Sequence, residues 1–280
     1  MRTAVSRLEL LEPASVAEAL RMLQDEGPLI PLAGATDIYA GLNAGTPIGP
    51  RFLNLWHLDT LRRITCVDDV VSIGALATYA ALQRSVLVRR RLPILARAAA
   101  QVGGLQIQNR GTIGGNVATA SPAGDTLPVL AVADARVVLR SAAAGDRRVP
   151  ITEFSSAPRQ TVRRPDELIL AIEVPPVEGA QWFRKVGTRA AQAVSKVVMA
   201  GVRGPAPRVA LGSVAPTVVR LRRTESALAR GATLEEAIGV LGQEISPIDD
   251  IRSTARYRAQ VAANLLRVFW SDTEPGASGC

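Results

Sequence analysis

Histidine, cysteine and lysine are scarce in this chain of 280 residues, which holds one histidine, two cysteines and two lysines. A structural zinc site or an iron–sulfur cluster needs about four cysteine or histidine ligands. Cys66 and Cys280 therefore cannot form such a site, and we expect neither a metal centre nor a disulfide framework. The single histidine, His57 in NLWHLD, has no nucleophile motif around it. We expect no catalytic residue for acid–base or metal chemistry.

Long apolar runs are also missing from the sequence. No stretch approaches the ~18 apolar residues that span a bilayer. The first residues, MRTAVSRLELLEP, lack the apolar segment of a secretory signal. An apolar fraction of 48% still allows a sizeable core. We therefore expect a globular cytoplasmic protein without a membrane span.

Aromatic residues make up 4% of the chain, and the net charge is +8. The basic residues are almost all arginines, and they are scattered apart from short runs at Arg89–Arg91 and Arg220–Arg223. Aromatic side chains that could stack on bases do not alternate with these arginines. We therefore expect no nucleic-acid binding, and the charge fits solvated faces or an acidic partner surface.

A glycine-rich stretch, Gln106–Asp125, is the most informative part of the sequence and reads QIQNRGTIGGNVATASPAGD. Its glycines allow tight turns and close approach to a ligand. Thr112 and Asn116 could bond a ligand or hold the amides of the loop itself. Consecutive N–H groups in such a loop can cradle phosphate oxygens, and a helix predicted to begin near Pro122 would add its positive dipole end. The glycine spacing alone fits an ordinary turn between two elements equally well.

A second candidate phosphate site lies about 80 residues upstream. The apolar strand predicted at Leu29–Leu32 leads into the small residues of AGATD, and a helical apolar pattern with Ile38 and Leu42 follows. A strand that delivers a small-residue loop to a helix start can bind an anion with its free amides.

The remaining patterns predict a mixed α+β protein. Asp68-Asp69 separates two short apolar runs and indicates a hairpin, and Pro175-Pro176 is the predicted domain boundary. Further strands are predicted at 51–55, 137–139, 168–174 and 209–214, and helices after Ser15, Thr78, Pro93 and Thr233, over 127–133 and over 253–270.

The two small-residue stretches resemble a known family. RGTIGGN followed by ASPAGD resembles the second flavin-binding segment of the FAD (medium) subunits of molybdenum hydroxylases, the xanthine dehydrogenase and carbon monoxide dehydrogenase family. PLAGATDIYAGLNAG resembles the first segment of that family, usually PLAGGTDL. Gln108, Gly124 and Ala35 depart from the usual Arg, Ala and Gly. If the position of Ala35 needs a positive φ, alanine costs roughly 1 kcal/mol there.

The resemblance covers roughly residues 5–270 and implies an architecture. It implies a two-lobed FAD-binding domain of the PCMH type over residues 1–176, with lobes of about 1–57 and 58–176. A smaller α+β C-terminal domain follows over 177–270, and 271–280 form a tail. The dinucleotide is expected in the cleft between the two lobes.

The resemblance also implies roles for individual residues. Asp125 is expected to meet ribityl or ribose hydroxyls of the flavin, although it could instead cap the helix at Leu127. Leu168 and Ile169 are expected beside the flavin, although core packing explains them equally well. Lys185 is expected near the N1–O2 edge of the ring, unless it is a solvated lysine. Carried over position by position, the implied FAD contacts are Leu32, Ala33, Gly34, Ala35, Thr36, Asp37, Val102, Thr112, Ile113, Gly114, Gly115, Asn116, Thr119, Asp125, Leu168, Ile169 and Lys185.

The implied function is electron transfer. A molybdopterin-containing large subunit would oxidise the substrate, and a small subunit with [2Fe–2S] clusters would carry the electrons to this FAD, in a dimer of heterotrimers. FAD would pass them to an external acceptor. Ala190 and Gln192 depart from the family pattern, so the resemblance does not imply how that acceptor approaches the flavin. The alternatives are a stand-alone flavin oxidoreductase of the PCMH type and an interaction module without flavin.

Overall fold

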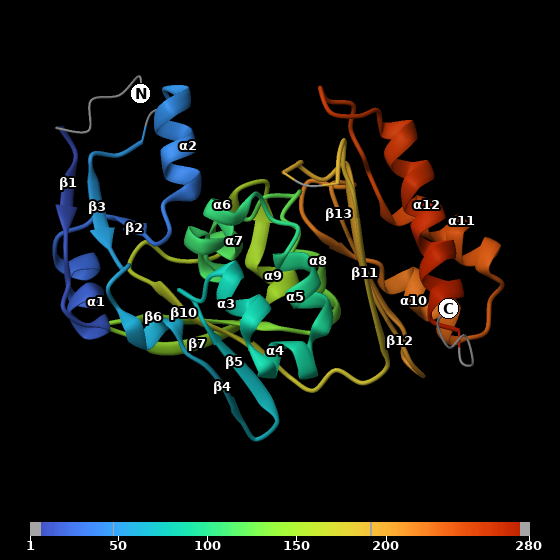
Figure 1. Ribbon diagram of the computed structural model, residues 1–280, viewed down its shortest axis with the longest axis horizontal. Helices are drawn as coiled ribbons and strands as arrows, with labels where there is room; N and C mark the ends of the chain where they lie inside the picture. Colours follow the sequence, from blue (N-terminus) through green and yellow to red (C-terminus); the bar gives the residue numbers. More distant parts are fainter. Residues whose placement is uncertain (1–6, 47, 191, 275–280) are drawn as a thin grey trace.

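The protein is described here by a computed structural model, which covers residues 7–46, 48–190 and 192–274. Three parts follow one another along the chain and lie side by side (Figure 1). We call them the N-terminal lobe (7–62), the central lobe (63–176) and the C-terminal lobe (177–274). Each is built on its own main β-sheet, and all three mix helices with strands. This arrangement agrees with the expected α+β fold class.

The N-terminal lobe contains a small parallel sheet with strand order β1-β3-β2. Because the strands are parallel, β2 and β3 end at the same edge of the sheet. Helix α1 packs on this sheet through Ala19, Leu20 and Leu23. The elements are β1 (Glu9–Leu11), α1 (Val16–Asp25), β2 (Ile30–Leu32), α2 (Thr36–Ala44), β3 (Arg51–Asn54) and the 3-10 helix η2 (Asp59–Arg62).

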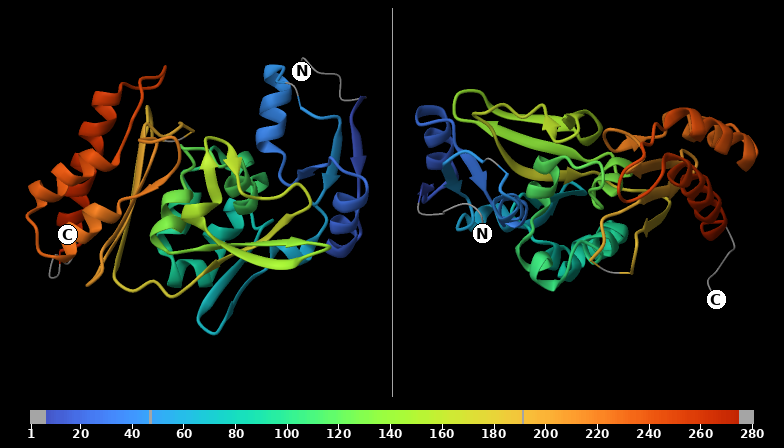
Figure 2. Two further views of the ribbon diagram at one scale, coloured as in Figure 1. Left: turned by 180° about the vertical axis from the view of Figure 1, so that it is seen from behind. Right: turned by 90° about the horizontal axis from the view of Figure 1, so that it is seen from above.

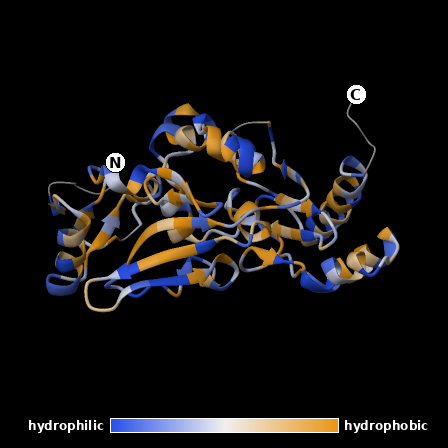
Figure 3. Cartoon of the chain, turned by 90° about the horizontal axis from the view of Figure 1, so that it is seen from below, coloured by the Kyte–Doolittle hydropathy of each residue, from blue (hydrophilic) through white to orange (hydrophobic). Residues whose placement is uncertain are grey.

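The central lobe has an antiparallel five-stranded sheet, β4-β5-β10-β6-β7, and a separate two-stranded pair, β8-β9. Its helices bury one face of the sheet, and the largest apolar core of the protein lies between them. Figure 3 shows apolar residues along the inner strands and hydrophilic residues on outer strands and loops. The elements are β4 (Ile64–Val67), β5 (Val70–Gly74), α3 (Tyr79–Arg84), α4 (Val86–Arg91), α5 (Pro93–Ala99), α6 (Leu105–Arg110), α7 (Ile113–Thr119), α8 (Leu127–Val132), β6 (Arg136–Ser141), β7 (Gly145–Pro150), α9 (Ile151–Phe154), β8 (Ser155–Ala157), β9 (Gln160–Thr161) and β10 (Leu168–Val174).

The C-terminal lobe has a four-stranded antiparallel sheet, and the described residues add the helices α10, α11 and α12. These helices lie on the outer face of the sheet (Figure 1 and Figure 2). Alternate residues of β12 serve two cores: Val198 and Ala200 face the central lobe, whereas Val197 and Met199 face the outer helices. The elements are β11 (Ala180–Val186), β12 (Val197–Arg203), β13 (Arg208–Gly212), β14 (Val219–Arg220), α10 (Arg222–Ala229), α11 (Leu234–Glu244) and α12 (Ala255–Asp272).

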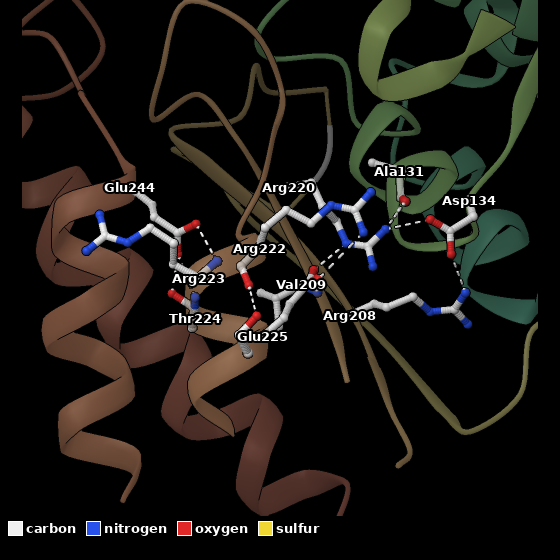
Figure 4. Close-up of polar contacts among 11 residues, drawn as sticks. Ala131, Asp134, Arg208, Val209, Arg220, Arg222, Arg223, Thr224, Glu225 and Glu244 are labelled. Atoms are coloured by element: carbon white, nitrogen blue, oxygen red, sulfur yellow. Dashed lines mark hydrogen bonds and ion pairs between the residues drawn. The ribbon is translucent and has the colours of Figure 1, made fainter. Parts of the chain in front are cut away.

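A buried arginine strengthens the contact between the C-terminal and central lobes. Arg220 donates to the carbonyl of Ala131 (3.0 Å) and to Asp134 (2.7 Å) in the central lobe, and its Nε donates to Glu225 in its own lobe (Figure 4). Only 5% of its side chain is exposed. A buried guanidinium needs such partners, because an unpaired charge in the interior is costly.

Most of the expected elements are present. The hairpin turns at Asp68 and Asp69, both with positive φ. Thr78 caps α3, and Thr233 with Glu236 forms a complete capping box on α11. At Ser15 only half of a capping box forms: the Ser15 hydroxyl accepts from the amide of Glu18, but the Glu18 carboxylate accepts from the amide of Ala14 and not from that of Ser15.

One part of the sequence-based prediction is wrong. No helix begins near Pro122, and α8 begins at Leu127. The glycine-rich stretch is itself helical, as α6 and α7, with Thr112 as the N-cap of α7. Glycine weakens a helix in isolation, but Gly114 lets α7 pack closely against Ala75, the residue that follows β5. Among the described residues, no helix is long and apolar enough to cross a membrane.

Candidate functional site

Free backbone amides gather at the start of α2. Among the described parts of the chain, the N–H groups of residues 33–38 have no hydrogen-bond partner. Ala35, at the N-cap, has φ 63° and ψ 4°, so the condition under which alanine is costly at this position is met. A left-handed residue before a helix turns successive amides toward one concave side, where an anion can bind them. Leu32, Ala33, Gly34, Ala35, Thr36 and Asp37 from the expected set lie in or beside this amide cradle.

The amide cradle is pressed against the glycine-rich stretch of the central lobe. A Cβ at Gly34 would lie 1.7 Å from the carbonyl oxygen of Arg110, so only glycine fits there. A second contact joins the same two segments, because Thr119 Oγ1 donates to Asp37 Oδ2 at 2.6 Å. The two segments singled out from sequence, about 80 residues apart, therefore meet where the N-terminal and central lobes touch.

The glycine-rich stretch does not supply a second amide cradle at its helix start. The amide of Ile113 donates to Ala77 (3.0 Å), that of Gly114 to Ala75 (2.9 Å) and that of Gly115 to the Thr112 hydroxyl (3.1 Å). A Cβ at Gly114 would lie 2.6 Å from the Cβ of Ala75. The expectation that these amides cradle phosphate is wrong, because they are bonded within the chain and their glycines serve close packing.

Asp125 and Lys185 are brought together from two lobes. Lys185 Nζ donates to Asp125 Oδ2 at 2.6 Å and to the carbonyl of Gln101 at 2.9 Å, and the hydroxyl of Ser195 donates to the other oxygen of Asp125. Only 8% of each charged side chain is exposed. Burial raises the pKa of the Asp125 carboxyl, and the donors from Lys185 and Ser195 oppose that rise.

Neither simpler explanation for this pair holds. Lys185 is not a solvated lysine, because it is buried against Asp125. Asp125 does not cap α8, because Thr126 occupies the N-cap position there, without a side-chain capping bond. A carboxylate has several lone pairs, so the pair retains acceptor capacity for a ligand hydroxyl.

The other expected residues divide between the cleft and the cores. Val102 is half-buried beside Gln101, which Lys185 contacts. Asn116 accepts a hydrogen bond from Thr126. Leu168 and Ile169 are 1% and 8% exposed and belong to two apolar cores, so packing accounts for their side chains.

Tyr79 was not expected from sequence, yet its buried ring packs against the glycine-rich stretch. A Cβ at Gly111 would lie 2.6 Å from its ring. Burial raises the pKa of the Tyr79 hydroxyl far above its ordinary value, and the negative charges of Asp37 and Asp125 raise it further. Arg110 and Trp56 were also missed; RGTIGG contains Arg110, but no local pattern pointed to Trp56.

A separate cavity of about 570 Å³ lies between the central and C-terminal lobes, beside the Arg220 network. Its lining includes Asp134, Arg208 and Glu225 and none of the residues expected to bind FAD. Arg208 and Arg220 both bind Asp134 at 2.7 Å, so these three charges in its wall are already paired.

Comparisons with known proteins identify the family. The family model described as the FAD binding domain in molybdopterin dehydrogenase matches residues 6–177, and the CO dehydrogenase flavoprotein C-terminal domain matches residues 181–273. The chain therefore belongs to the FAD-binding subunits of the molybdopterin dehydrogenases, a class of oxidoreductase flavoproteins with FAD as cofactor.

Individual relatives agree with this assignment over almost the whole chain. The carbon monoxide dehydrogenase medium chain of Hydrogenophaga pseudoflava is 30% identical, over 93% of this chain and 95% of the relative. The xanthine dehydrogenase FAD-binding subunit of Escherichia coli is 27% identical, over 95% and 96%. A solved structure of the Hydrogenophaga carbon monoxide dehydrogenase superposes with a TM-score of 0.86 at 28% identity and covers 93% of this chain and 95% of that chain.

Proposed function

We propose that this chain is the electron-transfer subunit of a molybdenum-containing dehydrogenase. Electrons would reach its FAD from [2Fe–2S] clusters of a small partner subunit and leave to an external acceptor. The observation that carries the proposal is the amide cradle at residues 33–38, which lies where the N-terminal and central lobes touch and has no partner among the described residues. Successive free backbone amides at a helix start donate hydrogen bonds to phosphate oxygens, so they can bind the diphosphate of a dinucleotide.

The residues present fit FAD at both ends of the cleft. The amides of residues 33–38 would bind the diphosphate, and Asp125 would accept from a hydroxyl of the ribityl or ribose portion while Lys185 holds it in place. Bound FAD supplies the one- and two-electron redox chemistry, and the chain supplies binding, orientation and electrostatics. The expected contacts, without a phosphate cradle formed by the amides of Ile113, Gly114 and Gly115, and the domain division at 176/177 belong to this proposal.

The proposal also assigns the missing chemistry to other chains. This chain has too few cysteines and histidines for iron–sulfur clusters. Its relatives include a medium chain and a subunit of a dehydrogenase complex. These observations support a molybdopterin-containing large subunit and a [2Fe–2S] small subunit as partners. The dimer of heterotrimers that the family resemblance implies is part of the same proposal.

The test is a flavin analysis of the purified full-length chain, alone and together with its partner subunits. A flavin spectrum and released FAD in either preparation would support the proposal. Absence of flavin from both would refute it and favour a flavin-free interaction module. Reduction of the isolated flavoprotein by an organic substrate would instead favour a stand-alone oxidoreductase.

A further inference from the structure

We propose that Arg110 is the cation that binds the ligand diphosphate beside the amide cradle. The inference rests on the proposed FAD-binding function and adds a residue outside the expected set of contacts. Arg110 is the last residue of α6, and its carbonyl group touches Gly34 in the middle of the cradle. The two residues are therefore neighbours across the junction of the two lobes.

The charge balance of the cleft calls for such a cation. A dinucleotide diphosphate brings two negative charges, whereas Asp37 already places a carboxylate in the first turn of α2. α2 itself has no basic residue, and Lys185 is paired with Asp125. Backbone amides and one helix dipole offset only part of this negative charge. A nearby guanidinium without a carboxylate partner would supply the remainder.

Arg110 meets this requirement. Its guanidinium carbon lies 3.8 Å from the ring centroid of Trp56. Within the described residues it has no carboxylate or hydrogen-bond partner. Stacking of the guanidinium plane on the ring leaves its N–H edge available to an anion. Arg110 is exposed, so a ligand in the cleft can reach that edge.

Trp56 holds Arg110 at the edge of the sheet where the amide cradle lies. It follows β3, and β3 runs parallel to β2, which delivers the amide cradle: Leu32 pairs with Asn54, and the amide of Leu55 donates to Leu32 at 2.9 Å. The tryptophan ring and the cradle therefore stand at the same carboxyl edge. The ring fixes a flexible side chain before the ligand arrives, which lowers the entropic cost of binding.

Arg62 provides a matched control because it lies on the same ring. Its guanidinium carbon is 4.1 Å from the Trp56 centroid. Unlike Arg110, it is already engaged: Nε donates to Asp59 at 3.1 Å, and Nη2 donates to the carbonyl of Trp56. Replacing each arginine by glutamine removes one stacking contact with Trp56, but only the change at Arg110 removes a guanidinium that is available to an anion. The comparison therefore separates loss of anion binding from loss of packing on the Trp56 ring.

The experiment compares flavin-depleted full-length wild type with Arg110→Gln, Arg110→Lys and Arg62→Gln. FAD, ADP and riboflavin are titrated at low and high salt. Arg110→Gln should weaken FAD and ADP by about 10- to 100-fold, the loss expected for a hydrogen bond to a charged group. Riboflavin, which has no phosphate, should bind all variants alike. The affinity of wild type for FAD should fall with salt more steeply than that of Arg110→Gln.

The two other variants sharpen the result. Arg110→Lys keeps the charge but not the planar fork, so it should recover part of the affinity. Arg62→Gln should bind FAD within a few-fold of wild type. The proposal is overturned if Arg110→Gln binds FAD as wild type does at low salt, or if it loses FAD and riboflavin equally. Wild type that binds neither FAD nor ADP, even with its partner subunits, would instead refute the proposed function.

Discussion

Lys185 Nζ lies 2.6 Å from Asp125 Oδ2, and this buried ion pair joins the C-terminal lobe to the central lobe at the cleft. The surrounding contacts strengthen the junction, since Ser195 donates to Asp125 and the amide of Ser213 donates to Pro122 at 2.8 Å. The loop that carries Asp125 is thus held by the C-terminal lobe. The position of Asp125 therefore depends on contacts between the central and C-terminal lobes.

Removal of Lys185 should destabilise the protein strongly. Lys185→Met leaves the Asp125 carboxylate buried without its cation, and breaking a buried pair in this way costs about 3–5 kcal/mol. The free energy of unfolding from denaturant titration measures the loss. Lys196→Met is the matched control, because Lys196 contacts the ring of Tyr257 and no carboxylate among the described residues. Equal stability of the two variants would contradict the role assigned to Lys185.

Gly34→Ala should disrupt the junction between the N-terminal and central lobes. The added Cβ would lie 1.7 Å from the carbonyl oxygen of Arg110, so one backbone must move. We expect a loss of stability of about 1–3 kcal/mol, as for other overpacked sites, together with loss of FAD from the purified protein. Gly239→Ala is the control, because nothing lies within 4 Å of its Cβ position in α11. A Gly34→Ala variant with the stability and the FAD content of wild type would contradict the predicted disruption of the junction.

Ala35→Gly should stabilise the protein. The alanine has φ 63°, a left-handed conformation that costs roughly 1 kcal/mol for a residue with a Cβ. Glycine removes that cost, although its greater freedom in the unfolded chain returns part of it. The unfolding free energy should therefore rise by less than about 1 kcal/mol. Ala40→Gly in the middle of the same helix should lower it by a similar amount, so opposite signs are the diagnostic outcome.

Asp250 should make the free energy of unfolding fall as the pH is lowered into the acid range. Burial alone would raise the pKa of its carboxyl, but the amides of Arg252 and Ser253 and the guanidinium of Arg258 lower it to about 2. In the unfolded chain an aspartate titrates near about 3.9. The contribution of Asp250 is therefore present above about pH 4 and is lost as the pH falls toward 2. Asp250→Asn should flatten this part of the pH profile of the denaturation midpoint; an unchanged profile would contradict the assignment.

Arg220 and Arg222 should differ sharply although they are two residues apart. Arg220→Met leaves Glu225 buried without its closest guanidinium, at an expected cost of about 3–5 kcal/mol. The side chain of Arg222 is 62% exposed and lies 4.0 Å from Glu225. Arg222→Met should cost at most about 1 kcal/mol, as for other surface pairs. Thermal and denaturant unfolding of both variants would test the ranking, and a reversed order would refute it.

Local structure was predictable where a few neighbouring residues decide it. The turn at Asp68-Asp69, the caps at Thr78 and Thr233 and the helix start at Pro93 follow from contacts within about four residues. The helix at Ile113–Thr119 was missed for the same reason. Its glycines disfavour a helix locally, and Ala75 and Ala77, which accept its first amides, lie some 36 positions away in the chain.

The sequence by itself determined most of the elements, the family and the two small-residue segments that meet between the N-terminal and central lobes. Only the tertiary structure decided which segment keeps its amides free. The first amides of α7 donate to Ala75 and Ala77, whereas α2 follows the parallel strand β2 and its first amides have no partner among the described residues. It likewise brought Asp125 and Lys185, 60 residues apart, into one buried pair. Local sequence patterns carry no information about such partners. A buried polar group must form hydrogen bonds, and the groups available to it are those that the whole fold places beside it.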